Sequence, residues 1–365
     1  MKKIKIDIPF FISIIILVGV GFLIFSSASL GLLSKQSAKY SSVTLNQTIF
    51  GLSLGLLAFF ITSGIDYKIY RKYAFFMFIA SIIATLLVFV PGVGVSHGGA
   101  KRWIYIAQLS IQPSEFLKIG FILYFSAWMA SVKNKAETFK YGLLPFIILI
   151  SVVGAILLKQ PDTDTFLITI FAGLAIFLTA GGKWKHILIL SLAGIFGLVV
   201  IAYTRPYVMN RINTFLHPSE NALGSGYQIQ QSLIAIGSGG FSGRGFGQSI
   251  QKFNFLPEPI GDSIFAVEGE EFGFLGSVFL ILLFVFFAFR GLKIATNTPD
   301  TFGRLLCVGI VILIVSQAFV NIGAMVGILP LSGITLPFVS HGGTALFMTL
   351  AEVGIVLNIS KNRKK

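Results

Sequence analysis

Apolar segments long enough to cross a bilayer recur along the whole chain. Mostly short polar connections separate them, and they occupy residues 8–33, 47–65, 73–91, 113–131, 142–158, 165–181, 186–204, 263–289, 304–329 and 343–360. A transmembrane helix needs about 20 mainly apolar residues, and most of these segments come close to that length. The pattern therefore predicts an all-α polytopic membrane protein with about ten transmembrane helices.

The composition excludes the soluble alternative. The chain has 365 residues, of which 55% are hydrophobic and only 12% are charged, and its mean hydropathy is +0.87. A soluble domain carries about twice that share of charged residues. Cys307 is the only cysteine and lies in an apolar run, so a disulfide scaffold and a zinc-thiolate site are also excluded.

The net charge of +14 is mainly a topology signal. Most basic residues lie in alternate connections, whereas a nucleic-acid surface would cluster them, so no nucleic-acid partner is expected. The positive-inside rule places this side, with both termini, in the cytoplasm. The residues concerned are Lys2, Lys3, Lys5, Lys68, Arg71, Lys72, Lys133, Lys135, Lys140, Lys183, Lys185, Arg290, Lys293, Arg304, Lys361, Arg363, Lys364 and Lys365.

Two connections on the opposite, outward side are long, at 92–112 and 205–262. A long connection in a chain of short ones is usually functional or disordered, and the apolar residues of 205–262 argue against disorder. Within it, 227–236 predicts a short amphipathic helix at the interface. The following glycine-rich stretch, with Arg244, suits either an anionic group or a flexible hairpin. We expect a single membrane domain, 1–365, with part of its site in 205–262.

Asp262 is the most prominent acidic residue, because it lies just ahead of the eighth apolar segment. Partial desolvation there raises the pKa of a carboxyl group and suits it to general-base chemistry. An N-cap of the following helix is the alternative. Glu268, Glu270 and Glu271 follow at membrane depth, where an acid is either functional or hydrogen-bonded to neighbouring helices.

Basic residues on the outward side complete the pattern. Glu115 and Lys118 are spaced i, i+3 at the start of the fourth segment, so they can pair inside the protein, as a lock or for an anionic ligand. Lys101 and Arg102 either snorkel to headgroups or contact a diphosphate. Residues 160–164 are interpreted as a simple turn, and His341 as an interfacial aromatic or a catalytic group. Together these residues predict an outward site for an amphipathic anionic molecule.

Four ordered motifs carry a family resemblance. They are GAKRWI with IQPSEFLK at 99–104 and 111–118, the glycine-rich stretch at 239–253, LPEPIGDSIFAVEGEE at 256–271, and LPFVSHGG at 336–343. The chain resembles the SEDS family of peptidoglycan polymerases, typified by FtsW and RodA, over nearly its whole length. It departs from the family pattern at Ile260, Gly261, Glu268, His341, Thr344 and Ala345, and at Thr163 and Asp164, where the family has Leu-Gly.

The resemblance implies an activity and a site. The reaction would be the polymerisation of lipid II into glycan strands, with inversion, a β-1,4 bond and undecaprenyl diphosphate as leaving group. Asp262 matches the family's essential acid and would be catalytic. Glu115 would orient Lys118, and the expected substrate-binding residues are Arg102, Lys101, Lys118, Glu115, Arg244, Gly240, Glu258 and Ser340.

The resemblance also implies partners and a location. It implies lipid II and undecaprenyl-linked glycan as ligands, a single-span class B penicillin-binding protein and other division or elongation proteins as partners, and the bacterial cytoplasmic membrane, with the active site on the extracytoplasmic face. No metal site in the protein and no cofactor are required, and the sequence does not decide whether the reaction uses Mg²⁺ or Mn²⁺. A division-type, FtsW-like role is favoured. A lipid II flippase, or a scaffold that only recruits the transpeptidase, are the alternatives.

Overall fold

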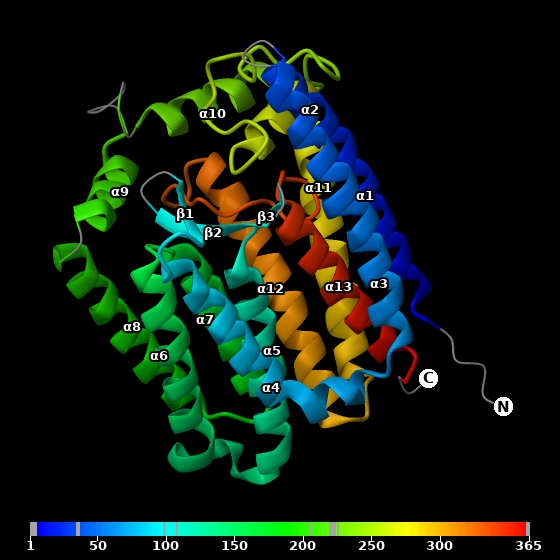
Figure 1. Ribbon diagram of the computed structural model, residues 1–365, viewed down its shortest axis with the longest axis vertical. Helices are drawn as coiled ribbons and strands as arrows, with labels where there is room; N and C mark the ends of the chain where they lie inside the picture. Colours follow the sequence, from blue (N-terminus) through cyan, green and yellow to red (C-terminus); the bar gives the residue numbers. More distant parts are fainter. Residues whose placement is uncertain are drawn as a thin grey trace.

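Helices dominate the computed structural model, which describes residues 6–33, 37–97, 100–106, 109–204, 206–218, 224 and 226–362. Each predicted span falls on a helix (Figure 1). The helices are α1 (Ile8–Ser29), α2 (Ser37–Leu45), α3 (Leu54–Gly64), α4 (Tyr67–Leu86), α5 (Pro113–Val132), α6 (Leu144–Lys159), α7 (Thr163–Thr179), α8 (Trp184–Thr204), α9 (Pro206–Leu216), α10 (Tyr227–Gly239), α11 (Ile264–Thr296), α12 (Thr301–Met325) and α13 (Gly343–Ser360). A π-helical segment, Asn46–Ser53, joins α2 to α3. Within the described residues, eight helical segments are long and apolar enough to cross a membrane, and Thr163–Thr179 is a shorter apolar helix.

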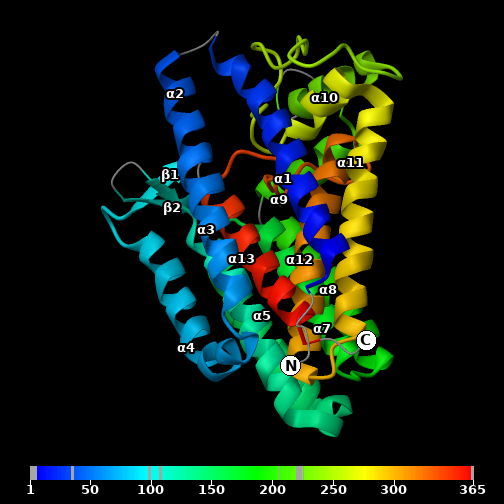
Figure 2. The ribbon, with the colours of Figure 1, turned by 90° about the vertical axis from the view of Figure 1, so that its right-hand side faces the viewer.

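Three helices form the interior of the bundle. α12 packs against α5, α7, α11 and α13, and both views place α5, α12 and α13 between the outer helices (Figures 1 and 2). About 72% of the apolar window of α12 and of α13 is buried, against 28% for α3 and α4. The apolar side chains that remain exposed on the outer helices, such as Phe60 and Phe76, suit a lipid environment. Cys307 is fully buried in α12 and donates to the Gly291 carbonyl of α11, at 3.3 Å.

Both described ends of the chain meet at one end of the bundle (Figure 2). The Asp7 amide donates to Ser360 Oγ at 3.1 Å, and the Asp7 carboxylate pairs with Arg290 at 2.7 Å. The α11–α12 connection lies there too (Figure 1). Arg290 and Lys293 lie in the last two turns of α11, and Arg304 lies in the first turn of α12. Three of the basic residues that we assigned to one side of the membrane therefore lie at the same end of the bundle as both described chain ends.

The outward connections contain more structure than the sequence pattern predicts. Residues 92–112 include a three-stranded antiparallel sheet, with β1 (Gly94–His97), β2 (Ala100–Ile106) and β3 (Leu109–Ile111) in that order. The helix predicted at 227–236 is confirmed as α10. The loop interpretation of 206–216 is wrong, because α9 lies there. The strands were missed because they are short and sit between two apolar helices.

α11 is interrupted at Gly273, where φ is 64° and ψ is −160°. This backbone conformation is essentially restricted to glycine, and it removes the usual donors from the Glu270 and Glu271 carbonyls. The Arg244 and Gly245 amides replace them, at 3.0 and 2.9 Å. The glycine-rich loop thus provides the hydrogen bonds that the broken helix lacks.

The helix also donates hydrogen bonds to the glycine-rich loop. The Phe274 and Leu275 amides, just beyond the break, donate to the Gly240 and Phe241 carbonyls at 2.9 and 3.1 Å. The two backbones approach so closely that a Cβ on Gly243 would lie 2.1 Å from the Glu271 carbonyl oxygen. A glycine at position 243 is therefore required for contact between the backbones, and the loop is docked on the helix rather than a free hairpin.

Gly273→Ala should destabilise the protein by about 1–3 kcal/mol or more, because alanine is strained at this φ and ψ and its Cβ would meet the Gly243 nitrogen at 2.3 Å. Thermal unfolding in detergent measures the effect. Gly19→Ala is the control, because Gly19 lies in α1 with no atom within 4 Å of the added Cβ. Equal melting temperatures for the two variants would contradict the role assigned to the break.

Candidate functional site

Backbone hydrogen bonds from two other segments fix the position of Asp262. The Asn321 side-chain amide, from the middle of α12, donates to the Asp262 carbonyl at 2.7 Å and to the Ile334 carbonyl at 2.8 Å. Ser340 Oγ donates to the Gly261 carbonyl at 2.6 Å. The backbone that carries the Asp262 side chain is therefore held from two sides, just before the N-terminal end of α11.

Asp262 lies in a cavity of about 220 Å³ whose other walls come from three segments. α9 and α10 provide four polar residues, and the connection between α12 and α13 provides the rest. The lining residues are Asn210, Arg211, Thr214, Gln228, Asp262, Leu331, Ser332 and Gly333. Asp262 Oδ1 and Ser332 Oγ have no hydrogen-bond partner among the described residues. Two buried polar atoms are thus available to a ligand here.

Burial raises the pKa of Asp262 to about 7, against the opposing effect of the Gln228 amide, and the Glu258 carboxylate adds to the rise. A carboxyl group with this pKa can accept a proton near neutral pH. The alternative of an N-cap is wrong, because Ser263 occupies that position ahead of Ile264 and makes no side-chain capping hydrogen bond. The predicted pKa shift and its cause are confirmed.

Arg102, on β2, does not line this cavity but lies beside Gly333, which does: a Cβ added to Gly333 would lie 4.0 Å from Arg102 Nη1. Alternate residues of a strand point to opposite faces, so Lys101 is exposed while Arg102 turns inward. Arg102 donates to the Gln160 and Pro161 carbonyls and lies 3.8 Å from Asp162. Burial raises the pKa of Asp162, and the Arg102 guanidinium opposes that rise. The segment 160–164 is therefore more than the simple turn that we predicted.

Lys118 and Glu115 are paired inside the protein, as their spacing predicts. Lys118 Nζ lies 2.8 Å from Glu115 Oε1, and the two side chains are only 3% and 7% exposed. Lys118 also donates to Gln317 at 3.2 Å, and Gln317 donates to the Thr335 carbonyl. Glu352 of α13 interacts electrostatically with the same pair. The pair is linked to the Asp262 cavity through α12 and residues 334–335, and it does not line that cavity.

Ser340 and His341 join the connection before α13 to the segment that carries Asp262. Ser340 Oγ accepts from the Leu336 amide and donates to Gly261, so its hydroxyl is engaged in backbone contacts. The His341 amide donates to the Ile260 carbonyl at 2.7 Å. Burial lowers the pKa of His341 to about 4, and its ring stacks on Phe25, so at neutral pH it is an uncharged aromatic.

Glu258 is exposed and takes a positive φ of 44° in the turn before Asp262, where its carbonyl accepts the Gly261 amide. Gly240 also has a positive φ, 56°, at the end of α10. Arg244 lies beside Glu270, with 3.4 Å between Nε and Oε1. Neither Arg244 nor Gly240 lines the Asp262 cavity.

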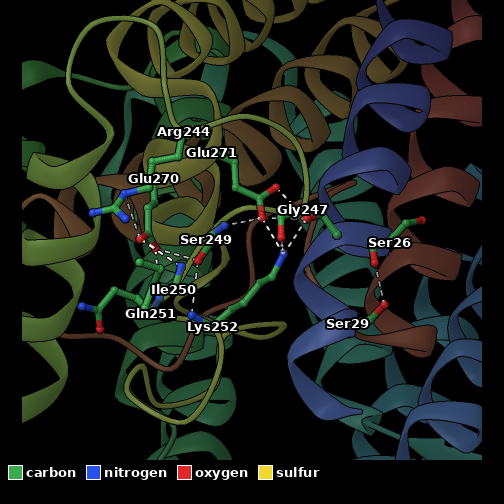
Figure 3. Close-up of polar contacts among 11 residues, drawn as sticks. Ser26, Ser29, Arg244, Gly247, Ser249, Ile250, Gln251, Lys252, Glu270 and Glu271 are labelled. Atoms are coloured by element: carbon green, nitrogen blue, oxygen red, sulfur yellow. Dashed lines mark hydrogen bonds and ion pairs between the residues drawn. The ribbon is translucent and has the colours of Figure 1, made fainter. Parts of the chain in front are cut away.

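The acids of α11 anchor the glycine-rich loop (Figure 3). Glu270 accepts hydrogen bonds from the Ser249 hydroxyl at 2.6 Å and from the Ile250 and Gln251 amides. Glu268 accepts one from Ser277 Oγ. Of the two interpretations of these acids, hydrogen bonding to a neighbouring helix is confirmed for Glu271, which accepts from Ser27 of α1. The partners of Glu270 lie in the loop, and the partner of Glu268 lies in α11 itself.

Glu271 forms a second anchor with a lysine that is completely buried. Lys252 Nζ lies 2.7 Å from Glu271 Oε1 and donates to Ser27 Oγ at 3.0 Å and to the Gly247 carbonyl at 2.9 Å (Figure 3). Ser27, at the outward end of α1, also donates to Glu271. One cluster therefore joins α1, the loop and α11.

Among the described residues, no group of three or more His, Cys, Asp or Glu side chains is arranged to hold a metal ion. The residues that sequence reasoning missed are Arg211, Asp164, Gln228, Asn321 and Ser332. Asn321 and Gln317, spaced i, i+4 within an apolar segment, are a signal that could have been used. The others come together only through the tertiary fold.

Comparison with known proteins gives consistent matches over the whole chain. The family model that spans FtsW, RodA and SpoVE, described as a cell cycle protein, matches residues 8–365. Stage V sporulation protein E of Bacillus subtilis (strain 168) is 36% identical over 360 residues, which cover 99% of this chain and 98% of that protein. A probable peptidoglycan glycosyltransferase FtsW of Geobacter sp. (strain M18) is 37% identical over 314 residues, covering 86% and 85%.

Solved structures share the fold. The crystal structure of the rod shape determining protein RodA of Thermus thermophilus matches with a TM-score of 0.71 and 26% identity, over 100% of both chains. A chain from a peptidoglycan synthase complex, described for its structural coordination of polymerization and crosslinking, matches with a TM-score of 0.75 and 28% identity, over 95% and 98%.

Lys252→Met should lower the free energy of unfolding by about 3–5 kcal/mol, because it leaves the Glu271 carboxylate buried without its cation. Thermal unfolding measures this, and adding Glu271→Gln to the same chain should recover much of the loss. Lys183→Gln is the matched control: it breaks an exposed pair with Glu137, 3.7 Å long, that contributes about 1 kcal/mol or less. A loss at Lys252 as small as that at Lys183 would refute the anchor.

Proposed function

Because this chain belongs to the FtsW, RodA and SpoVE family of cell cycle proteins, we propose that it is a peptidoglycan glycosyltransferase that polymerises lipid II into glycan strands. The observation that carries the proposal is the Asp262 carboxyl group, with an unpartnered oxygen and a pKa near 7, in a polar cavity at the outward end of the bundle. Relatives named as probable peptidoglycan glycosyltransferases support it.

The proposed step is a displacement with inversion. The 4-hydroxyl oxygen of one lipid-linked sugar attacks the anomeric carbon of the growing strand, and Asp262 accepts the proton of that hydroxyl group. The bond between that carbon and the diphosphate oxygen breaks, and undecaprenyl diphosphate leaves with the electron pair. The lipid is already activated, so the reaction needs no nucleotide and no resident cofactor. Polymerisation of lipid II by the purified protein, measured with and without a chelator, tests any contribution of Mg²⁺ or Mn²⁺.

Cations near the cavity would stabilise charge that develops on the leaving group. Arg102 is the best placed of the cations predicted from sequence, because its guanidinium lies beside Asp162 and next to Gly333, which lines the cavity. Lys118, oriented by Glu115, would act through the buried network that leads to residues 334–335. Lys101, Arg244, Gly240 and Glu258 would contribute from the outward surface, and Ser340 would position Gly261.

The apolar helices make this an integral membrane protein. We place it in the bacterial cytoplasmic membrane with both termini in the cytoplasm, because the basic connections lie at the end of the bundle away from Asp262. A single-span class B penicillin-binding protein is the proposed partner, together with other division or elongation proteins, and the related peptidoglycan synthase complex supports this. The relatives named FtsW support the proposal of a division-type, FtsW-like role.

Asp262→Asn should abolish glycan polymerisation, because an amide of nearly the same shape cannot accept the proton. The assay is polymerisation of lipid II by the purified protein with its transpeptidase. Glu137→Gln, which removes an exposed carboxylate, is the control and should polymerise normally. Normal polymerisation by Asp262→Asn would overturn the catalytic assignment. A transporter would be favoured if the wild type did not polymerise lipid II and if Asp262→Asn still flipped lipid II in proteoliposomes.

The pH profile should report the same group. Asp262 is active as the carboxylate, which predominates above its pKa of about 7. We therefore expect kcat/KM to rise about tenfold per pH unit below pH 7 and to level off above it. Glu137→Gln should leave the profile unchanged. A flat profile from pH 5 to pH 8 would contradict a proton-accepting role for Asp262.

A further inference from the structure

A second arginine, outside the residues predicted from sequence, lies on the wall of the Asp262 cavity. Arg211 comes from α9, and both Arg211 and Asp262 line the same space of about 220 Å³. Arg211 Nη1 donates to both carboxylate oxygens of Asp164, at 2.8 and 3.1 Å. These hydrogen bonds hold the guanidinium in place. The Arg211 side chain is 32% exposed, so the guanidinium is also accessible from the cavity that it lines.

Asp164 is fixed to a rigid part of the fold. It lies in the first turn of α7, where an acid is favoured by the helix dipole. Its Oδ2 accepts the Gly333 amide at 3.3 Å, and Gly333 lines the same cavity. Asp164 therefore sets the position of the guanidinium relative to the connection between α12 and α13.

The local charges show what this arrangement can bind. Asp162 and Asp164 lie two residues apart and pair with Arg102 and Arg211, which come from the sheet and from α9. Gly333 lies beside both ion pairs. Its amide donates to Asp164, and a Cβ added to it would lie 4.0 Å from Arg102 Nη1. Arg211 thus lines the cavity, Arg102 lies next to the Gly333 wall of the cavity, and each guanidinium pairs with one of the two aspartates.

A guanidinium group matches the geometry of a phosphate, which it can bind with two parallel hydrogen bonds. A diphosphate carries more negative charge than the Asp164 carboxylate, which pairs with Arg211 in this structure. A partly exposed ion pair contributes little to stability, so the exchange of one partner for the other costs little. Asp164 is therefore both a support for Arg211 and a competitor of any anion that binds it.

Building on the proposed function, we propose that Arg211 binds the diphosphate of a lipid-linked sugar in this cavity, and that Asp164 is a positioning residue that competes with the diphosphate for the guanidinium. The competing carboxylate belongs to this chain itself, so the competition would be present whenever substrate binds. Its expected consequence is a weaker apparent affinity for substrate than the same cavity would have without Asp164.

The test is the kinetics of lipid II polymerisation by the purified protein with its transpeptidase. Arg211→Gln should raise KM about tenfold or more, the loss expected for a charge-assisted bidentate contact, with a smaller change in kcat. Asp164→Asn should lower KM roughly two- to fivefold, the range expected from a partly exposed ion pair. The double variant should match Arg211→Gln alone. Lys183→Gln, which removes a cation at the other end of the bundle, should change neither constant.

Undecaprenyl diphosphate, which has no sugar or peptide, identifies the group that Arg211 contacts. As a competitor its inhibition constant should rise in Arg211→Gln in parallel with KM. An unchanged constant would overturn the assignment to the diphosphate, in favour of another anionic group of lipid II. Arg211→Lys, which keeps the charge and loses the paired hydrogen bonds, should give intermediate values and replaces Arg211→Gln if that variant melts early.

A KM within twofold of wild type in Arg211→Gln, or a raised KM in Asp164→Asn, would overturn the proposal. These results require a wild-type protein that polymerises lipid II. A wild type that does not polymerise would instead refute the proposed function, so the two failures are distinguishable.

Discussion

The need to satisfy every backbone hydrogen bond at membrane depth governs how this structure builds its site. A helix that breaks in a bilayer leaves amide and carbonyl groups that water cannot reach. α11 breaks at Gly273, and the loop at 240–245 provides both the missing donors and the missing acceptors. The buried acids beside the break then hold the rest of that loop. The outward segment that leads to Asp262 is positioned as a result.

The cations around the candidate site each lie close to a carboxylate. Arg102, Lys118 and Arg244 each lie beside a carboxylate, which keeps a cation near an apolar bundle without leaving it desolvated and alone. Asp262 is the contrast, because its Oδ1 has no partner among the described residues and burial raises its pKa. A cavity that combines one unsatisfied carboxyl group with supported arginines is suited to accept a proton and to hold a phosphate.

The sequence predicts what depends on local pattern. Hydropathy located the long apolar helices but not α9, and the i, i+3 spacing of Glu115 and Lys118 correctly predicted a buried pair. It could not predict contacts between distant segments, such as Asn321 with the Asp262 carbonyl or Arg211 with Asp164, which are 59 and 47 positions apart. The short strands were missed because their alternation is too brief to stand out between apolar helices.

The burial of Cys307 has a practical consequence for studying this protein. Its thiol is the only one in the chain and donates inside the bundle, to a carbonyl of α11. Thiol-reactive labels should therefore leave the native protein untouched in its folded state. Cysteines introduced in pairs on α9 and on the connection between α12 and α13 would be the only accessible thiols. Spin labels on them would report how the cavity width changes during turnover, with no need to remove a native cysteine.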